Sequence, residues 1–298
     1  MELEYKTFNA EDGAEIKYID EGEGKPFFYF YGMGSSIESQ KLFIECLVKN
    51  FRCIVLDQRA YGKTAATDKD SIPQAARDGK ALLDYLKIDK TVMMGYSMGG
   101  AVIFSYVQQF GCDRIEKILI GDMTPKIINE DGWNLGLYQG HYTREMFEQD
   151  LYYIKHDYKK FALTLAEQIL FKNNPENPRN FEGTADEIRA RIIAKNPNPA
   201  IMEGLFNGLV DITPDHIKSN YKYWSTLAGE DYREALSEIT VPVGLICPVP
   251  GSIYSLETAK YIASRVKDGT VFPMDGCTHM AVGENRPKMM EYIEKFAL

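Results

Sequence analysis

The segment from Thr91 to Val107 constrains the fold more than any other part of the chain. It begins with a β-branched and apolar run, reaches Gly95-Tyr96-Ser97-Met98-Gly99, and continues with apolar residues at helical spacing. This order predicts a strand, a sharp turn and a helix. The pattern G-x-S-x-G fits a turn that holds its serine in a strained backbone conformation above the sheet edge. We expect Gly95 and Gly99 to be required, because a Cβ there would press against the neighbouring strand or helix.

The pattern alone is common, and a tight turn that merely contains serine would also produce it. A catalytic serine needs an imidazole to take its proton, because the hydroxyl is a poor nucleophile near neutral pH. Three of the four histidines, His141, His156 and His216, lie in or beside a predicted helical insertion. His279 instead follows the last predicted strand and precedes the closing helix. The sequence therefore predicts that His279 is the base for Ser97.

Strands and helices alternate on both sides of a long central segment. Strands are predicted at 7–8, 14–19, 27–31, 52–56, 91–94, 115–121, 241–247 and 270–272. Helices are predicted at 40–49, at 71–87, after the turn at Ser97, and at 256–266 and 287–296. Ser71 and Gln74 have the spacing of a capping box. Such alternation predicts an α/β fold with a largely parallel sheet covered on both faces.

Residues 126–235 differ, because they contain no clear buried strand and have polar, proline-containing breaks at 173–178 and 196–199. We interpret this segment as an inserted helical lid. The core would then consist of residues 1–125 and 236–298. Most of the lid aromatics are expected to pack within the lid, and a few should face Ser97.

Composition narrows the range of partners. The net charge is -9, and no cluster of lysine and arginine indicates a nucleic-acid partner or an acidic phosphate ligand. A neutral or weakly polar small molecule is therefore the expected substrate. The five cysteines show no C-x-x-C spacing and are interpreted as reduced thiols in a cytoplasmic protein. We see no signal peptide, no apolar run of about 18 residues that would span a membrane, and no metal or cofactor motif.

Taken in chain order, five features resemble the α/β-hydrolase superfamily. They are the Gly32–Gly34 loop, the Asp57–Gly62 segment, the Gly95–Gly100 elbow, the stretch from Glu230 to Val243, and His279. The resemblance extends over nearly the whole chain and is to the lid-bearing branch that includes bacterial esterases, lactonases and cofactor-free haloperoxidases. It implies the α/β-hydrolase fold, with a mostly parallel sheet flanked by helices and an inserted helical lid.

Negative charge that develops on a substrate oxygen needs fixed hydrogen-bond donors. The elbow would supply the backbone N–H of Met98, and the resemblance implies a second donor at the N–H of Met33. Tyr31 stands where the family usually has histidine. The substrate pocket is predicted to include Tyr31, Gly32, Trp133 and Trp224.

The acid of the predicted triad has several candidates in the sequence. Family members usually carry an aspartate in the loop after the strand at 241–247, but Gly251 stands about there. Some relatives place the acid after the preceding core strand, where this chain has Asp122. The alternatives are that Asp122 only caps a turn, that Asp275 is the acid, or that Ser97 and His279 act with water or a backbone carbonyl. Asp57 and Arg59 are interpreted as structural.

These features favour a serine hydrolase that cleaves a small to medium, mainly apolar ester or lactone through an acyl-enzyme. Perhydrolysis, haloperoxidase-like activity and carbon–carbon bond hydrolysis use the same scaffold and are alternatives. A non-catalytic ligand-binding protein is a further alternative, which the missing aspartate at Gly251 favours. The physiological substrate and the oligomeric state stay open.

Overall fold

The computed structural model describes residues 2–170, 182–195 and 199–298. Eight strands form one sheet in the order β1-β2-β4-β3-β5-β6-β7-β8. Their bounds are β1 Lys6–Asn9, β2 Glu15–Glu21, β3 Lys25–Phe30, β4 Phe51–Leu56, β5 Thr91–Tyr96, β6 Ile115–Gly121, β7 Val243–Val249 and β8 Gly269–Asp275. β2 pairs antiparallel with β1 and β4, and all other neighbours are parallel. The predicted strands and the largely parallel sheet are confirmed.

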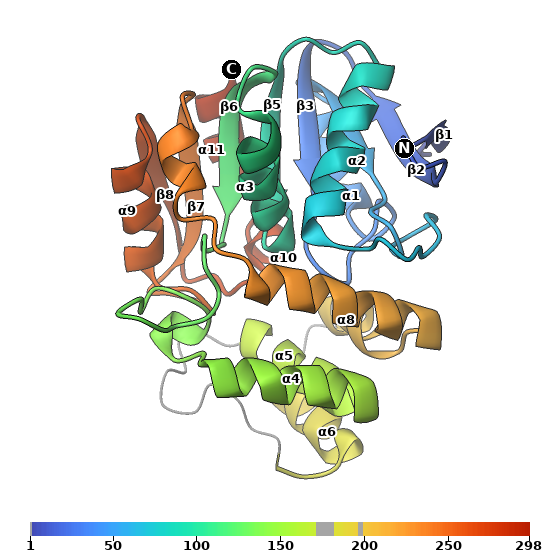
Figure 1. Ribbon diagram of the computed structural model, residues 1–298, viewed down its shortest axis with the longest axis vertical. Helices are drawn as coiled ribbons and strands as arrows, with labels where there is room; N and C mark the ends of the chain where they lie inside the picture. The colour runs from blue at the N-terminus through green and yellow to red at the C-terminus, as the bar shows by residue number, and fades with distance from the viewer. Residues whose placement is uncertain (1, 171–181, 196–198) are drawn as a thin grey trace.

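The sheet is flanked by α1 Lys41–Leu47, α2 Ile72–Tyr85, α3 Met98–Phe110, α9 Leu256–Arg265, α10 Ala281–Glu284 and α11 Arg286–Ala297 (Figure 1). All six residues of β5 are buried, as the uninterrupted apolar run predicts for a strand covered on both faces. Ser71 caps α2 by accepting the Gln74 N–H. The predicted capping box is wrong in its second half, because Gln74 Oε1, which would accept the Ser71 N–H, accepts the Arg77 Nε–H instead.

Between β6 and β7 the described residues form helices and one isolated bridge, which joins Lys126 to Asp231. The α-helices are α4 Arg144–His156, α5 Tyr158–Leu170, α6 Ala185–Lys195, α7 Pro199–Leu205 and α8 Pro214–Gly229. Short turns occur at η1 Tyr138–Gly140, η2 Phe206–Val210 and η3 Ala235–Glu238. Figure 1 shows α4, α5, α6 and α8 together beyond one end of the sheet. Of the two predicted breaks, 173–178 and 196–198 lie outside the described residues.

α8 is fastened to the loops at the carboxyl ends of the core strands. The Tyr61 hydroxyl donates to Asn220 at 2.6 Å, and the Ser219 hydroxyl donates to Asp70 at 2.6 Å. The Tyr223 hydroxyl donates to the carbonyl of Arg59 at 3.1 Å. These buried bonds hold the helical segment over the end of the sheet where Ser97 lies. None of the described helices is long and apolar enough to cross a membrane.

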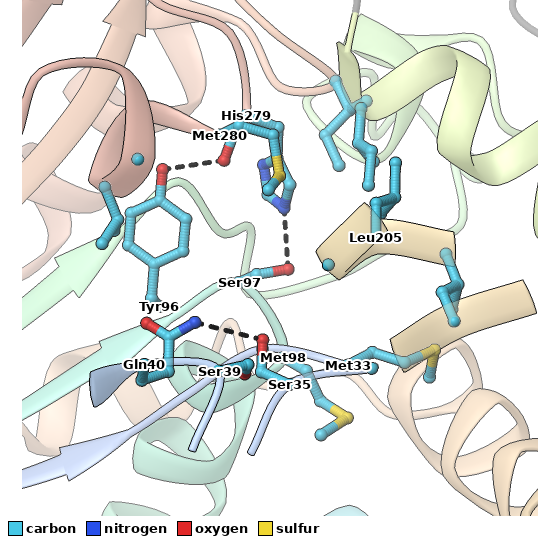
Figure 2. A pocket seen from close by; sticks show the side chains of 18 of the residues that line it. Met33, Ser35, Ser39, Gln40, Tyr96, Ser97, Met98, Leu205, His279 and Met280 are labelled. Carbon is cyan, nitrogen blue, oxygen red and sulfur yellow. Dashed lines mark hydrogen bonds between the residues drawn. The ribbon is translucent and has the colours of Figure 1, made fainter. Parts of the chain in front are cut away.

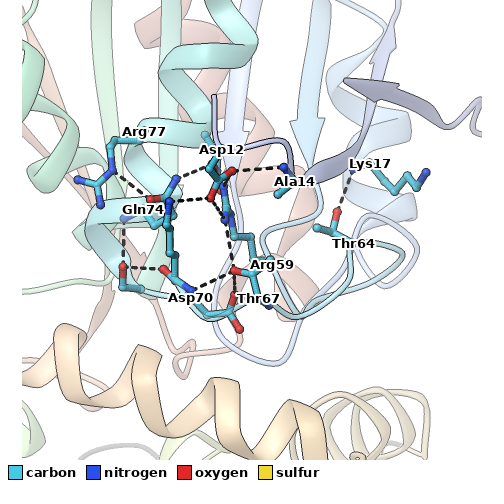
Figure 3. A network of polar contacts seen from close by, with 12 residues as sticks. Asp12, Ala14, Lys17, Arg59, Thr64, Thr67, Asp70, Gln74 and Arg77 are labelled. Atoms are coloured by element: carbon cyan, nitrogen blue, oxygen red, sulfur yellow. Dashed lines mark hydrogen bonds and ion pairs between the residues drawn. The ribbon is translucent and has the colours of Figure 1, made fainter. Parts of the chain in front are cut away.

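Asp57 and Arg59 are structural, as expected. Asp57 is buried and accepts hydrogen bonds from the Tyr31 hydroxyl and from the backbone N–H groups of Ile37 and Lys63. The Arg59 guanidinium, 1% exposed, binds the carboxylates of Asp12 and Asp78 at 2.7–2.9 Å (Figure 3). This network ties the loop after β4 to α2 and to the turn between β1 and β2.

Candidate active site

Ser97 lies at the turn between β5 and α3 in a left-handed conformation, with φ of 53° and ψ of -126°. Its N–H donates to the carbonyl of Gly121 at the end of β6, at 2.7 Å. A Cβ on Gly95 would overlap the backbone of Gly99, and one on Gly99 would overlap the carbonyl of Phe30 in β3. The predicted need for glycine at both positions is confirmed. The strained turn thus directs the serine hydroxyl away from the sheet.

Three predicted side chains form a hydrogen-bonded chain. The Ser97 Oγ lies 2.8 Å from His279 Nε2, and His279 Nδ1 lies 2.6 Å from Asp122 Oδ2 (Figure 2 shows the first of these contacts). His279 is 6% exposed and Asp122 is 4% exposed. An imidazole held this way can accept a proton at Nε2 while a buried carboxylate fixes the hydrogen on Nδ1.

The loop that carries His279 is held from both sides. The Tyr96 hydroxyl donates to the carbonyl of His279 at 3.0 Å. Burial and the nearby Asp122 raise the pKa of Tyr96 well above its usual value, so the hydroxyl stays a donor. The Glu284 carboxylate accepts the Thr278 N–H at 2.6 Å and hydroxyl at 2.8 Å. These contacts fix the backbone on which the imidazole is mounted.

Asp122 follows β6 with φ of 43°, and its N–H donates to the carbonyl of Ile246 in β7 at 2.8 Å. The Ser252 hydroxyl donates to Oδ2 of Asp122, the oxygen that also faces His279. Ser252 belongs to the loop in which family members usually place the acid. Gly251 in that loop has φ of 145°, and a Cβ there would lie 2.9 Å from Gln139 Nε2. Asp275 is exposed at the end of β8.

Two backbone N–H groups near Ser97 have no acceptor among the described residues. They belong to Met98, the first residue of α3, and to Met33, in the loop after β3. Both residues line the same cavity as Ser97. The loop approaches Ser97 closely, since a Cβ on Gly32 would lie 3.1 Å from the Ser97 Cβ. The arrangement offers donors to an oxygen of a molecule bound at Ser97.

Ser97 and His279 open into a cavity of about 390 Å³, which is a typical volume for a small-molecule site. The helical segment supplies an apolar wall that consists of Leu165, Ile169, Leu205, Leu209, Trp224 and Leu227. Gly32 and Trp224 lie where the sequence predicted them. The Trp224 indole N–H donates to the Tyr142 hydroxyl at 3.2 Å, and Trp224 also lines the cavity.

The pocket prediction is wrong for two residues, Tyr31 and Trp133. The Tyr31 side chain is fully buried outside the cavity, where its hydroxyl donates to Asp57 at 2.9 Å and accepts the Gln58 N–H at 3.1 Å. Trp133 also lies outside the cavity, because its indole N–H donates to the carbonyl of Lys126 at 3.0 Å and its ring packs against Tyr261. Both side chains are held by a polar partner that no local pattern identifies.

Sequence reasoning missed Ser252, Tyr96 and Glu284. Tyr96 lies inside the elbow pattern at a variable position, and Glu284 lies five residues after His279 in a stretch that contains no recognisable motif. A hydroxyl in the loop after β7 was the available signal for Ser252, because that loop must lie beside Asp122 in a parallel sheet. In the described parts of the chain, no group of three or more His, Cys, Asp or Glu side chains is arranged to hold a metal ion.

Comparisons with known proteins agree with this architecture. A family model described as the alpha/beta hydrolase fold matches residues 25–134. The chain is 32% identical over 133 residues to a non-heme haloperoxidase of Rhodococcus erythropolis, a match that covers 43% of this chain and 48% of that protein. It is 25% identical over 278 residues to a bifunctional esterase/perhydrolase of Acinetobacter calcoaceticus, with 91% of each chain covered.

Among solved structures, the bromoperoxidase of Bacillus anthracis superimposes with a TM-score of 0.78 at 18% identity, covering 99% of both chains. At this sequence identity, the structural likeness shows the fold alone. Together with the sheet order, the elbow and the family model, it confirms the fold that the sequence predicts. The chain has the α/β-hydrolase fold, and its residues 25–134 match the model of the family described by that fold.

Proposed function

We propose that the protein is a serine hydrolase that cleaves a carboxylic ester or lactone of small to medium size through an acyl-enzyme on Ser97. The hydrogen-bonded chain from Ser97 through His279 to Asp122 carries this proposal. Such a chain activates a hydroxyl that is otherwise unreactive. The esterase named among the relatives supports the same reaction class.

In the proposed reaction, Ser97 Oγ attacks the substrate carbonyl while His279 Nε2 takes the hydroxyl proton. The carboxylate of Asp122 stabilises the imidazolium that forms. The N–H groups of Met33 and Met98 then donate to the oxyanion of the tetrahedral intermediate. His279 returns its proton to the leaving alcohol oxygen, and a water molecule activated by the same imidazole hydrolyses the acyl-enzyme.

The cavity supports a mainly hydrocarbon substrate body. Its wall over Ser97 is formed by leucine, isoleucine and tryptophan side chains from 126–235, and we propose that this segment is the lid of the enzyme. A cavity of about 390 Å³ has room for a small or medium ligand and not for a polymer.

Perhydrolysis is a second candidate, since a relative whose match covers 91% of the chain is described as a bifunctional esterase/perhydrolase. In that reaction hydrogen peroxide replaces water in attacking the acyl-enzyme, with the same side chains. The case for a non-catalytic protein rested on the missing aspartate at Gly251. Asp122 within 2.6 Å of His279 Nδ1 weakens that case.

The test is covalent labelling by a fluorophosphonate probe, followed by intact-mass measurement. We expect one adduct on the parent protein, none on Ser97→Ala, and strongly slowed labelling of His279→Ala and Asp122→Asn. Ser264→Ala is the control, because this exposed serine lies on α9 away from the cavity, and it should label like the parent. A parent protein that does not label, or a Ser97→Ala variant that labels normally, would refute the proposal.

A further inference from the structure

The cavity has polar lining residues besides the apolar wall from the helical segment. Four of them are Tyr29, Ser35, Gln40 and Arg286, and we call these four residues the polar arm. The Tyr29 hydroxyl donates to Gln40 Oε1 at 3.2 Å, and Gln40 Nε2 donates to the Ser35 hydroxyl at 3.4 Å (Figure 2 shows the second bond). α1 begins directly after Gln40 and contacts α11, whose first residue is Arg286.

Arg286 is the part of the polar arm that lacks a partner. Its Nε is buried without a hydrogen bond, and its guanidinium forms no ion pair with any described residue. Nearby acidic groups are engaged elsewhere, since Glu284 binds Thr278 and Glu291 binds Lys288. Buried donors in proteins are nearly always satisfied. Because Arg286 lines the cavity, its guanidinium calls for an acceptor from a ligand.

The charges that line the cavity limit which chemical group of a ligand could be that acceptor. Among the described lining residues Arg286 is the one with a permanent charge, and the rest are apolar or neutral apart from His279. A planar carboxylate matches the fork of a guanidinium, whereas a phosphate dianion would need more positive charge than this cavity offers. The protein carries a net charge of -9, so its overall field does not attract anions. Selection of a carboxylate would depend on this local contact.

We propose that the cavity binds the carboxylate of its ligand through Arg286, with Gln40 and Ser35 as neighbouring polar groups. This inference rests on the proposed function. Together the two mean that the substrate is an ester or lactone that carries a free carboxylate away from the bond to be cleaved. The apolar wall holds the hydrocarbon chain between the two ends.

The experiment separates binding from turnover by using the Ser97→Ala protein. Calorimetry compares the monomethyl esters of succinic, adipic and suberic acids with their dimethyl esters, which lack the carboxylate. We expect at least one monomethyl ester to bind about tenfold or more tightly than its dimethyl partner, because hydrogen bonds to charged groups have this magnitude. Arg286→Gln should abolish the preference. Lys288→Gln changes the charge equally on the same helix, where Lys288 pairs with Glu291, and should preserve it.

Equal affinities within every pair, or a preference that survives Arg286→Gln, would overturn the inference. Hydrolysis of the dimethyl esters by the parent protein tests the proposed function separately. A protein that prefers the carboxylate but hydrolyses no ester would refute the hydrolase and leave the Arg286 site standing.

Discussion

Replacing Asp122 by asparagine tests the most contested assignment of the site, because it removes the charge and keeps the shape. The His279 imidazolium that forms during the reaction would lie beside a carboxylate, with Nδ1 and Oδ2 2.6 Å apart and both side chains buried. Opposite charges with centres about 4 Å apart attract by about 4 kcal/mol at an effective dielectric constant of about 20. Since about 1.4 kcal/mol corresponds to a factor of ten in rate, kcat/KM should fall about 10³-fold.

The assay is hydrolysis of 4-nitrophenyl butyrate, followed by the release of nitrophenolate, with thermal unfolding as the check on folding. Asp275→Asn is the matched control, because Asp275 is the competing candidate in the sequence and is exposed in the structure. It should keep the parent rate. A folded Asp122→Asn variant within tenfold of the parent would refute the electrostatic argument, and loss of activity in Asp275→Asn would move the acid to that residue.

Three further changes have expected outcomes. Ser252→Ala removes the hydroxyl that donates to Asp122 and should lower kcat about tenfold at unchanged KM in the same assay. Gly99→Ala forces a methyl group onto the carbonyl of Phe30 and should lower the unfolding temperature by about 5 °C or more in calorimetry. The Arg59 guanidinium, by its hydrogen bonds, holds the pKa of Asp12 well below its usual 3.8. The unfolded chain therefore binds more protons as the pH falls below about 4, and stability is lost there. Asp12→Asn should show a shallower loss in denaturant titrations between about pH 4 and pH 2; an identical slope would contradict this.

The fold could be predicted because its determinants are local. Buried parallel strands appear as uninterrupted apolar runs, such as Phe27–Phe30. The elbow sterically requires glycine at Gly95 and Gly99. Ser97 and His279 could be singled out because Ser97 directly follows a core strand and His279 lies in the loop after the last strand. The packing of the helical segment was more difficult to predict. An amphipathic helix shows that one of its faces is buried, but its sequence does not show which element covers that face.

The errors concern side chains whose direction is set by a hydrogen-bond partner that the sequence pattern does not identify. Tyr31 directly follows a core strand, as Ser97 and Asp122 do, but the carboxylate of Asp57, 26 positions away, accepts its hydroxyl hydrogen bond and holds it outside the cavity. Trp133 is aromatic and lies in the helical segment, as Trp224 does, yet the carbonyl of Lys126 captures its indole. The guanidinium of Arg286 pairs with no residue in the described parts of the chain, and the sequence gives no sign of this, because an absent partner leaves no pattern.

The position of the acid follows from the parallel sheet. β6 and β7 are neighbours, so the loops after Gly121 and after Val249 emerge side by side and either can reach the imidazole. In this chain the β7 loop has a left-handed residue at Gly251 and the Gln139 amide against it, which disfavours a side chain there. Asp122 occupies the β6 position instead, and the β7 loop contributes the Ser252 hydroxyl to the same carboxylate oxygen. A missing aspartate in one loop is therefore weak evidence against catalysis in this fold, unless the adjacent loop also lacks a carboxylate.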